Sequence, residues 1–147
     1  MKVFLNQLFD YNFYCNKQLI ERCEQMSQVP EKSIWLFSHI LNTHHRWNAK
    51  LMDKKAEYDL FQIHPISDWA EIHYENQRNS FEITMNTSDF DRRVDYENDE
   101  GRLFTNTVQD ILFHIINHST HHRGQMSTDF RNNEIEPIPL DFVMYKR

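Results

Sequence analysis

Apolar residues recur at helical spacing in four separate stretches of this 147-residue chain. The stretches cover residues 3–26, 30–53, 67–86 and 107–131, and in each of them apolar side chains return every three or four positions. This spacing places an apolar stripe along one side of a helix, and the stripe must be buried against other elements. The pattern therefore predicts an all-α fold, a four-helix bundle built from these segments.

Residues 88–106, between the third and fourth predicted helices, follow a different pattern. Apolar and polar residues alternate loosely there, and the turn-forming run from Asn98 to Gly101 interrupts them. We expect a long connection or a small hairpin in this part of the chain. Directly after it, Thr107 and Asp110 have the spacing of a capping box, which predicts the start of the fourth helix.

The composition agrees with this architecture. Two glycines and four prolines are few for a β-protein, which needs turn residues at short intervals. A chain of 147 residues, 14% of them aromatic, is long enough to bury a hydrophobic core. We expect a single domain that spans residues 1–147.

The formal net charge of −6 argues against some classes of function. Nucleic-acid-binding surfaces need basic patches, and none stands out, so we expect no nucleic-acid partner. No apolar run approaches the roughly 20 residues of a membrane span, and the first residues do not resemble a signal peptide. Cys15 and Cys23 would lie about 12 Å apart along one helix, too far for a disulfide. These observations predict reduced cysteines, no membrane partner and a cytoplasmic location.

The predicted fourth helix holds the most unusual feature of the chain, because four of the nine histidines fall within nine of its residues. Ile111, Ile115, His118, His122 and Met126 form one stripe, so two imidazoles take positions that a buried face normally gives to apolar residues. Each such exchange loses about 1.5–3 kcal/mol of apolar burial. A metal ion would compensate, because histidines four apart on a helix can reach the same ion.

A metal site of this kind needs a third ligand from another helix. The predicted second helix offers His39, His44 and His45. His44 lies on the central apolar stripe with Phe37 and Trp47, whereas His39 lies on the stripe beside it. The pattern favours His44, but the residues alone leave the choice between His39 and His44 undecided.

Two runs of residues carry a resemblance to a known family. They extend from Ser38 to Trp47 and from His114 to Gln125, and the second run, with its HxxxH spacing followed by Arg-Gly-Gln, is the more specific. Together with Tyr11 and Asn12 in the first helix, they resemble the DinB family of metal-dependent hydrolases and thiol transferases. The resemblance extends over the whole chain and implies a helical bundle.

The resemblance also implies a divalent metal ion held by one histidine of the second helix and the HxxxH pair of the fourth. In that family the second-helix ligand stands eight residues before a large apolar or aromatic residue, here Trp47, which selects His39. The implied metal ligands are therefore His39, His118 and His122. Three neutral imidazoles leave a coordination position for water or a thiolate, and they suit Zn²⁺, Ni²⁺ and Fe²⁺ alike.

The function implied by the resemblance is that of a metal-dependent enzyme, a thiol transferase or a hydrolase. The metal would activate a small thiol or a water molecule against a small electrophilic substrate. The alternative is a non-catalytic, stress-related bundle that binds metal. The expected partners are a small-molecule substrate, such as a low-molecular-weight thiol, and a second copy of the chain in a homodimer.

Three residues near these motifs receive further interpretations. We expect His44 to lie beside the metal or to face the substrate, with a hydrogen-bonded core histidine as the alternative. Gln125 follows His122 by three residues and is expected to orient its ring through a hydrogen bond. Gly124 is unfavourable in mid-helix, which indicates a close helix contact, such as one across a dimer.

Four other polar residues are given simpler interpretations. His64 and His73, in a predicted loop and in the third helix, are expected on the surface. Asn12 and Asn16 lie on or near the apolar stripe of the first helix and are expected to be partly exposed. The alternative for the two asparagines is a polar group that faces an internal site.

Overall fold

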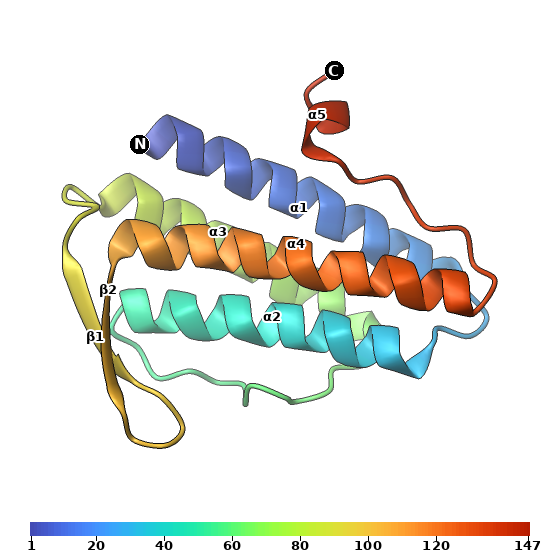
Figure 1. The fold of residues 1–147 in the computed structure, drawn as a ribbon, viewed down its shortest axis with the longest axis horizontal. Helices are drawn as coiled ribbons and strands as arrows, with labels where there is room; N and C mark the ends of the chain where they lie inside the picture. The colour runs from blue at the N-terminus through green and yellow to red at the C-terminus, as the bar shows by residue number, and fades with distance from the viewer.

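Four long helices run alongside one another in the computed structural model, which describes residues 1–147 (Figure 1). They are α1 (Lys2–Gln25), α2 (Glu31–Leu51), α3 (Ile66–Asn86) and α4 (Val108–Asn132). The prediction of a four-helix bundle is confirmed, and the predicted ends of the helices differ from the observed ones by no more than two residues. A short helix, α5 (Phe142–Tyr145), follows near the C-terminus.

The packing of α2 against α4 is the arrangement that matters most for function. These two helices lie side by side at the front of the view, and α1 and α3 form the other pair of closely packed helices (Figure 1). After α2, residues 52–65 run back along the outer side of this helix before α3 begins (Figure 1). Side chains of α2 and α4 can therefore meet beneath a covering loop.

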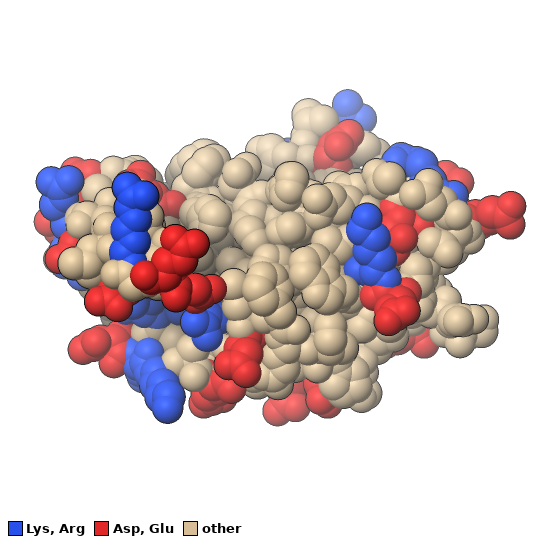
Figure 2. Space-filling view, turned by 60° about the horizontal axis from the view of Figure 1, so that its bottom comes forward, with Lys and Arg blue, Asp and Glu red and all other residues tan.

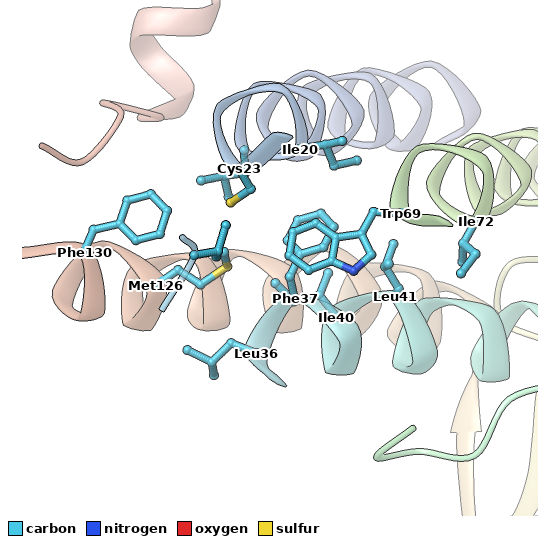
Figure 3. Packing of buried hydrophobic residues seen from close by; sticks show 12 residues of the cluster. Ile20, Cys23, Leu36, Phe37, Ile40, Leu41, Trp69, Ile72, Met126 and Phe130 are labelled. Carbon is cyan, nitrogen blue, oxygen red and sulfur yellow. The ribbon is translucent and has the colours of Figure 1, made fainter. Parts of the chain in front are cut away.

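The larger of two buried apolar clusters joins all four long helices (Figure 3). At its centre Phe37 of α2 stacks on Trp69 of α3 with 4.5 Å between ring centroids. Met126 and Phe130 of α4 and Cys23 of α1 are buried in the same cluster. Burial of each large apolar side chain stabilises the fold by about 1.5–3 kcal/mol, which fixes α2 against α4.

A hairpin lies at the end of the bundle where α4 begins (Figure 1), and its presence confirms the prediction for residues 88–106. Its antiparallel strands are β1 (Arg93–Glu97) and β2 (Leu103–Thr107). Gly101 in the turn has φ of 76°, a conformation that glycine adopts without strain. Thr107 then caps α4 directly: its hydroxyl accepts from the Asp110 amide at 3.2 Å, and the Asp110 carboxylate accepts from the Thr107 amide at 3.0 Å. Strand β2 thus continues into α4 without a loop, and the predicted capping box is confirmed.

Several smaller predictions about the chain can be checked against the fold. Cys15 and Cys23 are both free, as expected, and both are buried. None of the helices combines the length and the apolar character that crossing a membrane requires. Figure 2 shows lysine and arginine side chains intermingled with acidic ones toward the two ends of one face, with a middle area largely free of both. No basic patch dominates that face.

Candidate metal centre

Three histidines from two helices converge between α2 and α4. Each of His39, His118 and His122 offers one ring nitrogen, and these atoms all lie within 4.8 Å of one another. The Nε2 atom of His118 lies 3.2 Å from that of His39 and 3.0 Å from that of His122. The three residues implied by the sequence resemblance therefore form one group that could hold a metal ion.

The spacing of these nitrogen atoms fits a metal ion. Imidazole nitrogens bind Zn²⁺ at about 2.0–2.1 Å, so two nitrogens on a tetrahedral ion lie about 3.3–3.4 Å apart. The two Nε2 separations, 3.2 and 3.0 Å, are close to that value. These two separations suit a small cation, and all three candidate ligand atoms lie within 4.8 Å of one another.

Hydrogen bonds at the far side of two rings fix which nitrogen faces the centre. Nδ1 of His39 lies 3.2 Å from the backbone carbonyl oxygen of Leu60, and Nδ1 of His122 lies 2.7 Å from Oε1 of Gln125. Because a carbonyl oxygen only accepts, each Nδ1 carries the proton and each Nε2 keeps its lone pair. This confirms the prediction that Gln125 orients His122, an arrangement typical of metal-bound histidines. Nδ1 of His118 has no hydrogen-bond partner.

The electrostatic surroundings keep the α4 pair neutral. Burial, together with the neighbouring His122 and His39 rings, lowers the pKa of His118 from its usual value of 6.5 to about 3. Burial also lowers the pKa of His122. At neutral pH both imidazoles are therefore unprotonated, as metal binding requires.

The covering loop, residues 52–65, supplies the backbone acceptor for His39. The side-chain amide of Asn42 on α2 donates to the carbonyl oxygens of Leu60 at 3.3 Å and Gln62 at 2.8 Å, which ties this loop to the helix. Trp35 and Phe61 stack against the His39 ring, with centroid distances of 5.4 and 5.2 Å. Sequence reasoning missed these groups, because a backbone carbonyl leaves no signal in the sequence and both aromatic residues are exposed.

A cavity of about 430 Å³ opens beside the histidine group. His39, His118 and His114 line it, together with the aromatic side chains of Trp47 and Tyr96. Its remaining lining residues are polar or charged for the most part and include two basic residues of α2 and two acidic residues of the hairpin: Arg46, Lys50, Glu97 and Asp99. A small molecule in this cavity would lie next to two of the three converging histidines.

His44, the candidate that the apolar stripe favours, faces a different part of the molecule. Its side chain is 1% exposed, stacks on Phe9, and lies with Nε2 2.7 Å from Oγ of Ser80 on α3. It neither belongs to the histidine group nor lines the cavity. The interpretation of His44 as a residue beside the metal is wrong, and the alternative, a hydrogen-bonded core histidine, is what the structure shows.

Two further histidines were expected on the surface and are buried instead. His64 is 4% exposed and pairs through Nε2 with Oδ1 of Asn42 at 2.6 Å. His73 is 2% exposed, stacks on Phe13 and lies with Nε2 3.2 Å from the Phe13 carbonyl oxygen. Each finds its partner far away in the sequence, which is why local pattern placed it wrongly.

The interpretations of Asn12, Asn16 and Gly124 also need correction. Both asparagines are fully buried, and their side-chain oxygens accept hydrogen bonds from Arg123 of α4. The alternative interpretation, polar groups that face inward, therefore describes them better. Gly124 makes no close helix contact within the chain, because a Cβ atom placed on it would meet nothing within 4 Å, while a contact across a dimer stays a prediction.

The fold and the histidine group together define a class of protein, a four-helix bundle with a three-histidine site that could hold a metal ion between two of its helices. The model of the DinB family matches residues 1–147, and the chain belongs to this family. It is similar to Protein DinB of Bacillus subtilis strain 168, with 18% identity over 99% of this chain and 95% of the relative. It is also similar to the uncharacterized protein YizA of the same strain, with 25% identity over 93% of this chain and 92% of the relative.

Proposed function

We propose that this protein is a metal-dependent enzyme that activates a small thiol or a water molecule against a small electrophilic substrate. The observation that carries the proposal is the convergence of three Nε2 atoms, from His39, His118 and His122, beside a cavity of about 430 Å³. Cavities of this size are typical of small-molecule sites.

The three histidines would hold the metal, and their surroundings support that role. Leu60 and Gln125 hold two of the rings with Nε2 directed toward the centre. A divalent ion bound there would act as a Lewis acid and lower the pKa of a water molecule or thiol that reaches it. The donor set does not select among Zn²⁺, Ni²⁺ and Fe²⁺.

The cavity supports a substrate of mixed polarity. Trp47 and Tyr96 offer aromatic surface, while Arg46 and Lys50 offer positive charge for an acidic group of the substrate or cosubstrate. His114 lines the same cavity, and partial burial lowers its pKa, so its neutral ring can accept a proton near the reacting atoms. A low-molecular-weight thiol with an acidic group would match this lining.

Metal analysis of the purified protein gives the first test. We expect one divalent ion per chain in the wild type, and loss of that ion in His118→Ala. His121→Ala is the matched control, since His121 lies exposed on the same helix and outside the histidine group. Equal metal content in wild type and His118→Ala would contradict the proposal that these histidines hold the metal.

Turnover separates catalysis from the alternative of a non-catalytic metal-binding bundle. The metal-loaded protein would be assayed with a panel of small thiols, with and without a chlorinated aromatic electrophile, and with simple esters for the hydrolase reaction. The proposal expects turnover that disappears on chelation and in His39→Ala. Stoichiometric metal without turnover anywhere in the panel favours the non-catalytic bundle. We also propose a homodimer, which sedimentation of the same sample tests.

A further inference from the structure

A second and larger cavity lies on another side of α4. It has a volume of about 780 Å³ and forms between α4, Tyr11 of α1 and the C-terminal segment 134–141. In Figure 1 this segment is the red irregular stretch that leaves the end of α4 and turns back toward α1. None of the three converging histidines lines this cavity, so it is a site separate from the proposed metal centre.

Arg123 of α4 lines this cavity and carries a buried positive charge. Its side chain is 4% exposed, and its Nη1 donates to Oδ1 of Asn12 at 2.6 Å and of Asn16 at 2.9 Å. Its Nη2 donates to Oγ1 of Thr120 at 3.1 Å. All three acceptors are neutral, and no carboxylate lies within ion-pair distance of the guanidinium. A buried charge without a counter-ion is unfavourable, so an anion beside Arg123 would be strongly held.

The guanidinium is also fixed in place and retains unused donors. A guanidinium has five N–H groups, and three of them are engaged with protein oxygens. The Tyr11 ring lies 5.6 Å from the central carbon atom of the guanidinium and supports it from one side. The other two N–H groups make no hydrogen bond to protein oxygens, and Arg123 lines the cavity, so they are available to a carboxylate there.

Gly124, the next residue, gives an independent reason to regard the cavity as a binding site. Glycine is among the least favourable residues in a helix interior. No packing contact within the chain requires it here, because a Cβ atom at this position would meet nothing within 4 Å. Gly124 lines the cavity beside Arg123, so its missing side chain keeps this space open.

Charged residues at the edge of the cavity narrow the class of ligand. Glu134, Glu136 and Asp141 are exposed lining residues, and Arg131 is the one basic residue among the exposed ones. The edge is therefore negative, which disfavours a dianion such as phosphate. It favours a molecule with a positively charged group at the end opposite its carboxylate.

We propose that this cavity binds a small zwitterion, an amino acid whose ammonium group lies at the end opposite its carboxylate. The carboxylate pairs with Arg123, and the ammonium group is directed toward the acidic edge. A ligand with both groups satisfies the buried cation and the carboxylates of the edge together. The proposal is independent of the metal centre, which lies between α4 and α2.

Calorimetric titration with a matched set of probes tests the ligand class. The set contains 5-aminovalerate, valerate, pentylammonium and inorganic phosphate at equal ionic strength. We expect 5-aminovalerate to bind at least tenfold more tightly than the other three. The proposal that the ligand is a zwitterion would be overturned if valerate bound as tightly as 5-aminovalerate. Tighter binding of phosphate or pentylammonium would also overturn it. Absence of binding by both carboxylates would overturn the site itself.

A substitution at Gly124 tests whether the probe binds in this cavity, and it leaves the buried arginine in place. Gly124→Leu improves helix propensity and inserts a side chain into the cavity, so we expect an unchanged or raised melting temperature together with loss of 5-aminovalerate binding. Thr128→Leu is the matched control, since Thr128 is exposed on α4 and does not line the cavity. His118→Ala is expected to bind the probe as the wild type does. A Gly124→Leu protein that binds 5-aminovalerate with wild-type affinity would contradict the proposal.

Discussion

His39 and His118 are separated by 79 positions in the sequence, yet their Nε2 atoms lie 3.2 Å apart. The contact depends on the packing of α2 against α4, and the larger apolar cluster, which joins all four long helices, maintains that packing. The histidine group is therefore coupled to the stability of the fold, and its predicted properties can be tested residue by residue.

The choice between His39 and His44 is the first prediction. His39→Ala removes one of the converging nitrogens, so we expect loss of metal binding with little loss of stability. His44→Ala should retain metal and lower the free energy of unfolding by about 2–4 kcal/mol, because it leaves a core cavity and removes the hydrogen bond to Ser80. Metal content and urea denaturation, measured on both variants, check these two expectations. Loss of metal in His44→Ala with metal retained in His39→Ala would make His44 the ligand instead.

The second prediction concerns Gln125. Gln125→Leu removes the acceptor at Nδ1 of His122 without removing any converging nitrogen, so we expect metal affinity to fall by about 10–100-fold. Competition with a chromophoric chelator measures the affinity. The control, Gln25→Leu, makes the same substitution at an exposed position of α1 and should leave the metal affinity unchanged. An unaltered affinity in Gln125→Leu would mean that this hydrogen bond does not orient the ring.

The third prediction is a loss of stability in mild acid. Burial lowers the pKa of His73 from 6.5 to about 4, so between these values the unfolded chain takes up a proton that the folded chain does not. Above pH 6.5 both states are neutral and the effect is absent. As the pH falls from 6.5 toward 4, His73 alone should reduce the free energy of unfolding by at most about 1.4 kcal/mol per pH unit.

Urea denaturation of metal-free protein at several pH values checks this prediction. The pKa of His44 is lowered to about 3 and contributes in the same direction, so the comparison needs a variant at a single site. His73→Gln should show a shallower decline than wild type between pH 6.5 and 4. Equal slopes in the two proteins would contradict the role assigned to His73.

The fourth prediction concerns the contact between α1 and α4. Asn12→Ala removes one of the oxygen atoms that accept from the buried Arg123, so we expect a loss of about 1–3 kcal/mol in the free energy of unfolding. Asn117→Ala, at an exposed position of α4, should change it by less than about 0.5 kcal/mol. Equal effects of the two substitutions would show that the Asn12–Arg123 hydrogen bond adds little to stability.

Local patterns predicted the parts of this fold that depend on neighbouring residues. The capping box of Thr107 and Asp110 depends on three-residue spacing, and both of its hydrogen bonds are present. The pairing of His118 with His122 follows from one helical turn. Helix ends and the hairpin were likewise predictable, because apolar spacing and turn residues determine them within a few positions.

Residues whose partners lie far away in the sequence could not be placed in this way. Helix α2 packs against α3 on one side and α4 on another, so its buried stripe does not say which neighbour a given histidine faces. His44 faces Ser80 of α3, while His39 faces α4, and only the resemblance to the family distinguished them. His73, Asn12 and Asn16 were misplaced for the same reason, since polar residues are expected on the surface unless their distant partners are known.

The direct continuation of β2 into α4 has a consequence for how this protein can change over evolution. Residues at the turn end of the hairpin, including Glu97, Asn98 and Asp99, line the cavity beside the histidine group, whereas all three histidines lie on helices. Insertions or exchanges in this turn can therefore reshape the mouth of the cavity while the helices and their histidines keep their positions. The turn can thus vary in length and sequence without altering the three histidines that could hold a metal ion.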